Sequence, residues 1–273
     1  MKLKIGEYFF SWNRAVIMGI LNLTPDSFFD GGCYNDTDDI IRQSEKMIND
    51  GADIIDIGAF SSRPGMEVIS TKEELSRLLP SLVRIRETFP EVIISIDTFR
   101  KDVAMMAIEH GADIINDISG GTFDNEMLDY IGKNHIPYIM MHSGKCIEDL
   151  HSYIVENEIC HEVKSFFERQ TMKLSQYGEN TIILDPGIGF NKSMSDNFKL
   201  LKNIEEYRVK DRPILIGISR KSLIYKTLHI NPKEALNGTT VLNTIALLGG
   251  ADILRVHDVK EAVEIVKLLQ EFH

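Results

Sequence analysis

Three stretches of this chain repeat one six-residue pattern: GADIID at residues 51–56, GADIIN at 111–116 and GADILR at 250–255. In each stretch, a glycine typical of a helix C-terminus is followed at once by an apolar run rich in isoleucine. A helix that leads directly into a buried strand is part of a repeating βα unit. Because the pattern recurs from the first quarter of the chain to its end, it predicts an α/β fold with a parallel sheet.

Eight apolar, strand-like runs alternate with amphipathic helical patterns such as those over 71–88 and 158–177. The eight runs are residues 15–22, 53–58, 92–97, 113–118, 138–142, 181–185, 214–218 and 252–256. Eight βα units in 273 residues predict a (β/α)8 TIM barrel, which needs about 250 residues. A doubly wound sheet is the competing architecture, but it usually has fewer strands. We expect a single domain over residues 1–273, with a short N-terminal hairpin at the barrel bottom in residues 1–13.

The overall composition argues against nucleic-acid and membrane partners and indicates the cellular compartment. The formal charge of −11 and the lack of a Lys/Arg-rich run argue against a nucleic-acid partner. No apolar run approaches the ~20 residues of a membrane span, so we expect no membrane association. Three cysteines without a CxxC pair point to a reducing compartment, and we predict a cytoplasmic protein.

The last position of the repeat is polar in all three copies, as Asp56, Asn116 and Arg255. Equal offsets should place these side chains at similar heights inside the barrel. A buried carboxylate or guanidinium needs a partner, because its desolvation costs several kcal/mol. We therefore predict that Asp56 and Arg255 pair across the interior.

Further polar residues stand at the ends of the strand-like runs or shortly after them. They are Asn22, Ser62, Arg63, Asp97, His142, Asp185, Ser219, Lys221 and His257. An isolated aspartate or asparagine at a strand end is more often a helix cap or a turn former than a ligand-binding group. In an α/β barrel, however, the C-terminal strand ends all meet at one face, where active sites lie. The convergence predicts a site at this face.

The residues at this face fall into two chemical groups. The basic groups Arg63, Lys221, Arg255 and His257 favour an anionic substrate, and phosphate is the natural match for arginine. The second group consists of the hydrogen-bond acceptors Asp97, Asn116 and Asp185, and a carboxylate among them can accept paired hydrogen bonds from an amino-pyrimidinone edge. The amide oxygen of Asn22 suits a hard cation such as Mg²⁺.

The loop TPDSFFDG at residues 24–31 follows the first strand and combines a proline, two carboxylates and two phenylalanines. Aromatic side chains in such a loop predict a mobile lid over the site. The alternative is an irregular connector whose phenylalanines pack on the barrel rim.

Five segments together resemble the dihydropteroate synthase family: GILNLTPDSF (19–28), SRPG (62–65), DPGIGF (185–190), SRKS (219–222) and RVHD (255–258). The resemblance implies a (β/α)8 barrel that forms a homodimer. It also implies a transferase that joins 6-hydroxymethyl-7,8-dihydropterin pyrophosphate to 4-aminobenzoate in folate biosynthesis, and a site where sulfonamides compete with 4-aminobenzoate. Mg²⁺ is the implied cofactor.

The resemblance also implies a role for each matching residue. Asp97, Asn116, Asp185 and Lys221 would hold the pterin, with Met141 lining that pocket. Arg63, Arg255 and His257 would hold the pyrophosphate, and Asn22 would bind Mg²⁺. The 4-aminobenzoate subsite would be bordered by Phe28, Ser62, Pro64, Phe190, Lys221 and Ser222. Asp97, Lys221, Arg63 and Arg255 would be the catalytic residues.

Two segments depart from the family pattern. Phe60-Ser61-Ser62 stands where relatives often have Glu-Ser-Thr, and Ser143-Gly144-Lys145 replaces the more usual Met-Gln-Gly. A pterin-binding methyltransferase domain, which would transfer methyl from methyltetrahydrofolate to a corrinoid protein, shares the barrel and the pterin set. A catalytically silent paralogue is a further alternative. Arg63 and the 255–257 segment favour the synthase, because they resemble pyrophosphate-binding groups.

Overall fold

The computed structural model describes residues 2–5, 8–23, 37–60, 68–144, 146–147 and 158–272. Eight parallel strands form one sheet that curls into a barrel, in the order β8-β7-β6-β5-β4-β3-β10-β9. The strands are β3 (Val16–Asn22), β4 (Ile54–Gly58), β5 (Ile93–Asp97), β6 (Ile114–Asp117), β7 (Tyr138–Met141), β8 (Ile182–Asp185), β9 (Leu215–Ile216) and β10 (Ile253–Val256). The predicted (β/α)8 TIM barrel is confirmed.

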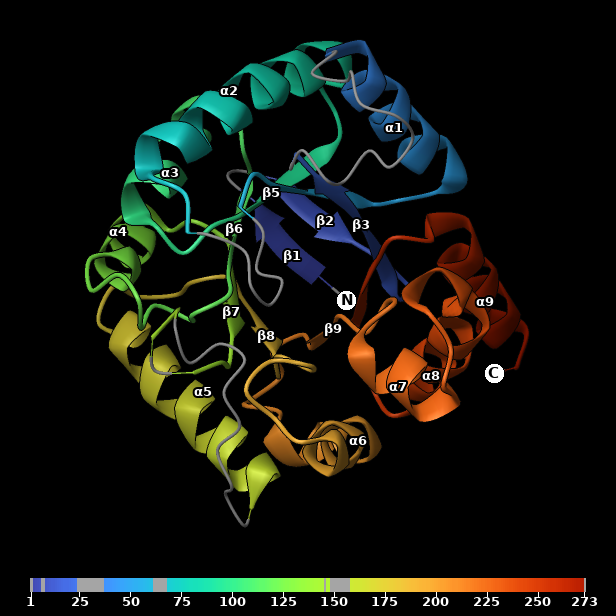
Figure 1. The fold of residues 1–273 in the computed structure, drawn as a ribbon. Coiled ribbons are helices and arrows are strands. Elements are labelled where there is room, and N and C mark those ends of the chain that lie inside the picture. Colours follow the sequence, from blue (N-terminus) through green and yellow to red (C-terminus); the bar gives the residue numbers. More distant parts are fainter. Residues whose placement is uncertain are drawn as a thin grey trace.

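Helices form an outer ring around the strands (Figure 1). They are α1 (Thr37–Asp50), α2 (Thr71–Thr88), α3 (Lys101–Glu109), α4 (Met127–Asn134), α5 (Ile159–Ser175), α6 (Met194–Lys202), α7 (Ser222–Leu228), α8 (Leu236–Leu248) and α9 (Val259–Phe272), with short 3₁₀ turns η2 (Ile204–Tyr207) and η3 (Pro232–Glu234). Local sequence sets several of their boundaries. For example, α6 begins with a capping box in which the hydroxyl of Ser193 accepts from the Asp196 amide, and the Asp196 carboxylate accepts from the Ser193 amide. In the described part of the chain, no helix is long and apolar enough to span a bilayer.

The barrel closes where β8 meets β9, and this junction has little backbone pairing. Strand β9 pairs with β10 over only two residues, and a single bridge between Leu184 and Ile214 links it to β8. The sequence predicted a longer strand over 214–218. The strand is shorter because the chain is already turning, with the Lys221 amide donating to the Ile218 carbonyl at 3.1 Å.

The expected N-terminal hairpin is present. β1 (Lys2–Ile5) pairs antiparallel with β2 (Tyr8–Ser11), and Figure 1 shows both strands within the ring of helices. The hydroxyl of Thr181, just before β8, donates to the Lys4 carbonyl at 3.0 Å. Trp12 packs against the apolar residues that fill the lower barrel. The hairpin therefore lies at the end where the strands begin.

The period-two geometry of the strands divides the barrel interior into layers. The lower layer consists of fully apolar side chains, one or two from each strand. They are Val16, Met18, Ile54, Ile93, Ile114, Ile139, Ile183, Leu215 and Ile253. Two residues further along several strands, the same inward face carries polar groups, including Asp56, Asn116, Asp185 and Arg255. The strands therefore place the site on top of a packed core.

The repeated glycine allows each helix to pass directly into its strand. Gly51, Gly111 and Gly250 have φ values of 101°, 98° and 102°, in the left-handed region that a side chain disfavours. This conformation confirms the helix-ending role predicted for the glycine.

The repeated aspartate just before each strand binds the neighbouring strand. Asp53 accepts from the Ile17 amide, Asp113 from that of Ile94 and Asp252 from that of Ile214, each at 2.8 Å. An arginine pairs with each carboxylate: Arg14 with Asp53, Arg86 with Asp113 and Arg208 with Asp252. No role was predicted for these aspartates, although their repetition is visible in the sequence.

Candidate active site

The predicted pair between Asp56 and Arg255 forms. The Arg255 guanidinium lies 2.6 Å from Asp56 Oδ2 and 2.8 Å from Asp97 Oδ2. The Asn116 amide donates to the same Asp56 oxygen at 3.0 Å. Asp56 is fully buried, so its carboxylate holds Arg255 from below, while Asp97 contacts it from strand β5. The last positions of the three repeats therefore meet in one hydrogen-bonded network.

A cavity lies next to this network at the C-terminal ends of the strands. Its lining consists of Asp97, Asn116, Ile118, Met141, Asp185, Phe190, Gly217, Lys221 and Arg255. Seven of these nine residues were predicted from the sequence. Ile118 and Gly217 were missed, because neither has a polar side chain and the family resemblance gave neither a role. Gly217 matters through its missing side chain: a carbon there would lie 3.7 Å from Arg255 Cβ and 4.0 Å from Lys221 Nζ.

Burial and the charge of Arg255 shift the pKa of Asp97 in opposite directions. Burial raises the pKa of the Asp97 carboxyl to about 7, against the lowering effect of Arg255, and the carboxylates of Asp56, Glu74 and Asp117 raise it further. The cavity thus carries more negative groups than Arg255 alone can neutralise. A ligand that presents positive charge or N–H donors to Asp97 would relieve this imbalance.

Lys221 and Asp185 form the other charged side of the cavity. Burial lowers the pKa of Lys221 to about 8, although Asp185 favours its charged form. Burial likewise raises the pKa of Asp185, against the effect of Lys221. Lys221 Nζ donates to the Ile188 carbonyl at 2.5 Å and lies 4.3 Å from the centre of the Phe190 ring. Lys221 thus links the polar floor to an aromatic wall.

The loop that carries Phe190 has a tightly defined backbone. The Gly187 amide donates to Asp185 Oδ1 at 2.7 Å, and Gly187 has a φ of 67°. A side-chain carbon at Gly187 would lie 2.0 Å from the His142 carbonyl oxygen, so only glycine fits. The Gly189 amide donates to Asn197 Oδ1 at 2.6 Å, which ties the loop to α6.

Several predicted residues lie near the cavity but do not line it. Ser222 is the first residue of α7, next to Lys221. His257 is exposed at the end of β10, where Ser219 Oγ lies 3.0 Å from its Nδ1. His142 is buried, 3.4 Å from a Glu162 oxygen and edge-on to the Phe166 ring.

Asn22 lies at the end of β3, in register with Gly58 and, through it, with Asp97. A carbon added at Gly58 would lie 3.6 Å from Asn22 Oδ1 and 3.8 Å from Asp97 Oδ2, so both oxygens border one point. In the described ranges, no group of three His, Cys, Asp or Glu residues could hold a metal ion. A hard oxygen from Asn22 fits an Mg²⁺ ion that takes its other ligands from phosphate and water.

Phe28, Ser62, Arg63 and Pro64 lie outside the described residues, as does the loop over 24–31. Their predicted positions remain predictions. Phe60 is described by the structure, and its ring packs edge-to-face against that of Phe99 with ring centres 5.7 Å apart. Phe99 in turn contacts Phe123 at 5.6 Å. An aromatic contact therefore occupies the position where the family pattern often has a glutamate.

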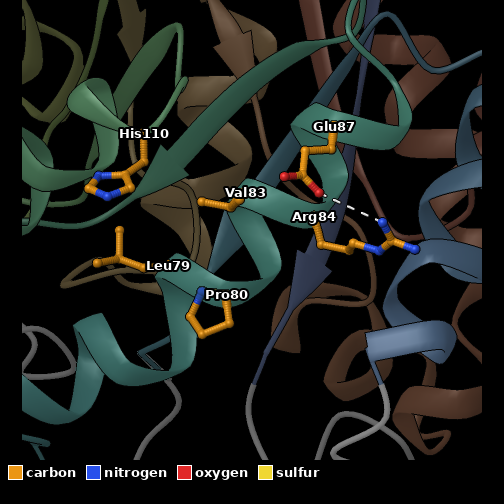
Figure 2. Close-up of a pocket in the computed structure, with 6 residues that line it drawn as sticks. All are labelled: Leu79, Pro80, Val83, Arg84, Glu87 and His110. Carbon is orange, nitrogen blue, oxygen red and sulfur yellow. Dashed lines mark ion pairs between the residues drawn. The ribbon is translucent and has the colours of Figure 1, made fainter.

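A second depression lies on the side of α2 and near the end of α3, lined by Leu79, Pro80, Val83, Arg84, Glu87 and His110 (Figure 2). All six residues are at least partly exposed. Arg84 and Glu87 pair there at 3.7 Å, a weak surface contact. None of the predicted site residues lines this depression, so the strand-end cavity is the candidate active site.

Comparison with known proteins agrees with this location. A family model described as "pterin binding enzyme" matches residues 18–257. The dihydropteroate synthase of Synechocystis sp. is 43% identical over 270 residues, covering 97% of this chain and 93% of that protein. The chain belongs to the dihydropteroate synthase family.

Solved structures of dihydropteroate synthases share the fold. The Yersinia pestis enzyme, determined with a sulfonamide drug complex, has a TM-score of 0.91 at 34% identity, covering 100% of this chain and 98% of that one. The Xanthomonas albilineans enzyme, determined with 4-aminobenzoic acid, has a TM-score of 0.90 at 30% identity, covering 99% and 97%. These relatives favour the synthase over the methyltransferase alternative, and the predicted family is confirmed.

Proposed function

We propose that this chain condenses 6-hydroxymethyl-7,8-dihydropterin pyrophosphate with 4-aminobenzoate to give 7,8-dihydropteroate and pyrophosphate. The observation that carries the proposal is the charged cavity at the strand ends, where Asp97, Asn116 and Asp185 face Lys221 and Arg255. Carboxylate and amide groups there match the N–H and NH₂ donors of a pterin ring. The pterinylmethyl transfer places the chain among the transferases.

We assign the floor of the cavity to the pterin. Asp185 and Asn116 would hydrogen-bond the amino-pyrimidinone edge, and Lys221 would donate to the ring, with Met141 packing on it. Asp97 would face the part of the ring that becomes positive when the methylene C–O bond breaks. A carboxylate already in place for a developing cation costs no reorganisation during the reaction.

We assign the outer part of the site to the pyrophosphate. Arg255 would stabilise the negative charge on the departing oxygen, together with His257 and Arg63. Arg255 is suited to this task because Asp56 and Asp97 fix its guanidinium from two sides. The geometry does not require Arg255 to move before it binds an anion.

Asn22 would hold Mg²⁺ next to the pyrophosphate. When bound, the ion would neutralise charge on the phosphate oxygens as the C–O bond breaks. The basic groups of the chain would act on the same oxygens.

We assign the face formed by Phe190, Lys221 and Ser222 to 4-aminobenzoate, with Ser62, Pro64 and Phe28 as further contacts. Pyrophosphate leaves with the electron pair of the C–O bond, the amine nitrogen then bonds to the methylene carbon of the pterin cation, and the nitrogen loses one proton. An arylamine is already a nucleophile, so no strong general base is needed. Sulfonamides, which share the aniline group, would compete at this face.

We further propose that the chain forms a homodimer and is cytoplasmic. Three apolar side chains of α8 are exposed on one helix face, Val241 by 50%, Ile245 by 44% and Leu248 by 56%. Leu228 of the adjacent α7 is also 50% exposed. A second copy covering this face would bury these side chains. Sedimentation of the purified chain and of Ile245→Lys tests this, with a dimer expected for the former and a monomer for the latter.

One assay tests the proposed reaction. Purified protein is mixed with the pterin pyrophosphate, 4-aminobenzoate and Mg²⁺, and pyrophosphate release and 7,8-dihydropteroate are measured. We expect both, in equal amounts, and no product without 4-aminobenzoate. A folded protein that releases no pyrophosphate above background contradicts the proposal. Methyl transfer from methyltetrahydrofolate to a corrinoid would support the alternative.

A further inference from the structure

Lys192 is a lysine to which neither the sequence motifs nor the proposed mechanism assigns a role. It lies between the Phe190 loop and the start of α6. Its ammonium donates to three backbone carbonyls: His142 and Gly187 at 3.1 Å each, and Phe190 at 3.0 Å. An ammonium has three N–H donors, so these three contacts use all of them.

This arrangement is costly for a lysine. In the described part of the chain, no carboxylate lies within ion-pair distance of Lys192 Nζ. Burial lowers the pKa of Lys192 to about 7. Asp185, Glu162 and Asp196 face it and favour the charged form, while Lys221 opposes it. A partly buried cation whose donors all end on main-chain oxygens fixes backbone geometry.

The three carbonyls belong to two different loops. His142 follows β7, whereas Gly187 and Phe190 belong to the loop after β8. Four other hydrogen bonds hold this second loop: Asp185 and Asn197 accept from two of its amides, Lys221 donates to the Ile188 carbonyl, and the Phe190 amide donates to the Gly187 carbonyl. Lys192 therefore binds the loop at both of its ends and joins it to the neighbouring strand.

The same loop sets where Phe190 stands. The Phe190 ring packs near the buried pair Ile118 and Met141, lines the cavity, and lies 4.3 Å from Lys221 Nζ. If the loop backbone shifts, this ring shifts with it. The floor groups Asp97 and Asn116 come from other strands and do not depend on the loop.

We propose that Lys192 is a positioning residue: by holding the carbonyls of His142, Gly187 and Phe190, it fixes the Phe190 wall and so sets the affinity for the arylamine substrate. The assignment of the arylamine to this wall rests on the proposed function. The holding of the loop does not, because it follows from the hydrogen bonds alone.

The test uses three variants of this chain. Lys192→Met keeps an unbranched side chain and removes every donor, whereas Lys192→Arg keeps the charge and the donors. The matched control is Lys202→Met, the same change at an exposed lysine at the end of α6. For each protein, KM for 4-aminobenzoate, KM for the pterin pyrophosphate, kcat and the melting temperature are measured.

We expect Lys192→Met to raise KM for 4-aminobenzoate about tenfold, the effect of losing hydrogen bonds from a charged donor. KM for the pterin pyrophosphate should rise less than KM for 4-aminobenzoate, because Asp97 and Asn116 lie on strands outside the loop. Lys192→Arg should recover part of the loss, and Lys202→Met should match the wild type. Equal KM changes for both substrates, or a lower melting temperature with both KM values intact, would overturn the proposal.

Amide hydrogen exchange provides a readout that needs no catalysis. We expect the Gly187 and Gly189 amides to exchange faster in Lys192→Met than in wild type or Lys202→Met, with exchange in β5 and β6 unchanged. If the wild type is inactive, the proposed reaction fails, and exchange alone decides whether Lys192 holds the loop. If Lys192→Met does not fold, Lys192→Gln, which keeps an amide donor, takes its place in both measurements. Unchanged loop exchange contradicts the proposal.

Discussion

The two ends of the six-residue repeat differ in how their polar side chains are used. At the lower end, Asp53, Asp113 and Asp252 each accept a backbone amide and pair with an arginine. At the upper end, Asp56 binds both Asn116 and Arg255, and these two residues line the cavity. The positions are only three residues apart, and a strand reverses its facing side at each residue.

This difference shows how a barrel separates stability from chemistry. The lower aspartates are paired at the strand starts, where they fasten each strand to its neighbour. In the upper network, Asp56 Oδ1 is buried and has no hydrogen-bond partner within the described ranges, and the pKa of Asp97 is raised by burial to about 7. The upper end therefore keeps acceptor groups for which a ligand can supply hydrogen-bond donors.

The largest expected effect comes from the cavity. Asp185→Asn and Lys221→Ala should each lower kcat/KM by at least roughly 100-fold, the usual size when a preorganised charged contact is lost. Both variants should stay folded, since the introduced asparagine would keep an oxygen for the Gly187 amide and loss of Lys221 removes a buried charge. Pyrophosphate release and circular dichroism melts measure the two properties. Wild-type turnover in either variant would contradict the assignment of the chemistry to the upper end of the barrel.

The pH dependence of activity sharpens the same comparison. Burial lowers the pKa of Lys221 to about 8, so its charged form is lost as pH rises through that value. We expect kcat/KM to fall about tenfold per pH unit above this point, since kcat/KM reports groups of the unliganded enzyme. In Lys221→Arg, which stays charged, this alkaline fall should disappear below about pH 10. If kcat/KM of Lys221→Arg still falls at alkaline pH as in the wild type, a group other than Lys221 causes the fall.

The smallest expected effects come from the lower end. Asp113→Asn weakens the contacts with the Ile94 amide and Arg86, and should lower the free energy of unfolding by about 1–3 kcal/mol. Activity per folded molecule should not change. Asp50→Asn, which removes a surface pair with Lys46, is the matched control and should cost under about 0.5 kcal/mol. Urea unfolding measures both. A large loss of turnover in folded Asp113→Asn would show that the two ends are not independent.

Much of the fold and the floor of the site could be predicted from the sequence. Apolar runs predicted all eight barrel strands because each is buried on both faces and lacks polar alternation. The pairing of Asp56 with Arg255 followed from equal offsets within a repeat. These features are local or periodic, and period and burial are what a single sequence records best.

The parts that could not be predicted depend on backbone paths between elements. Gly217 lines the cavity by lacking a side chain, and Lys192 acts on carbonyl oxygens that every residue has. Nothing in residue type marks such contacts. The role of Asp113 was missed for a related reason: its partner is the amide of Ile94, which lies on the preceding strand.

The junction between β9 and β8 has the least backbone pairing of the described barrel, because β9 is short. With two paired residues on one side and one bridge on the other, β9 is the strand that costs least to detach. Lys221 and Gly217 lie just after it, while Asp97 and Asn116 lie on well-paired strands on the far side of the cavity. A pterin that contacts Asn116 and Lys221 together would bridge this junction. The bound ligand would then oppose the separation of β9 from β8, so the occupied barrel would need a larger force to open than the empty one.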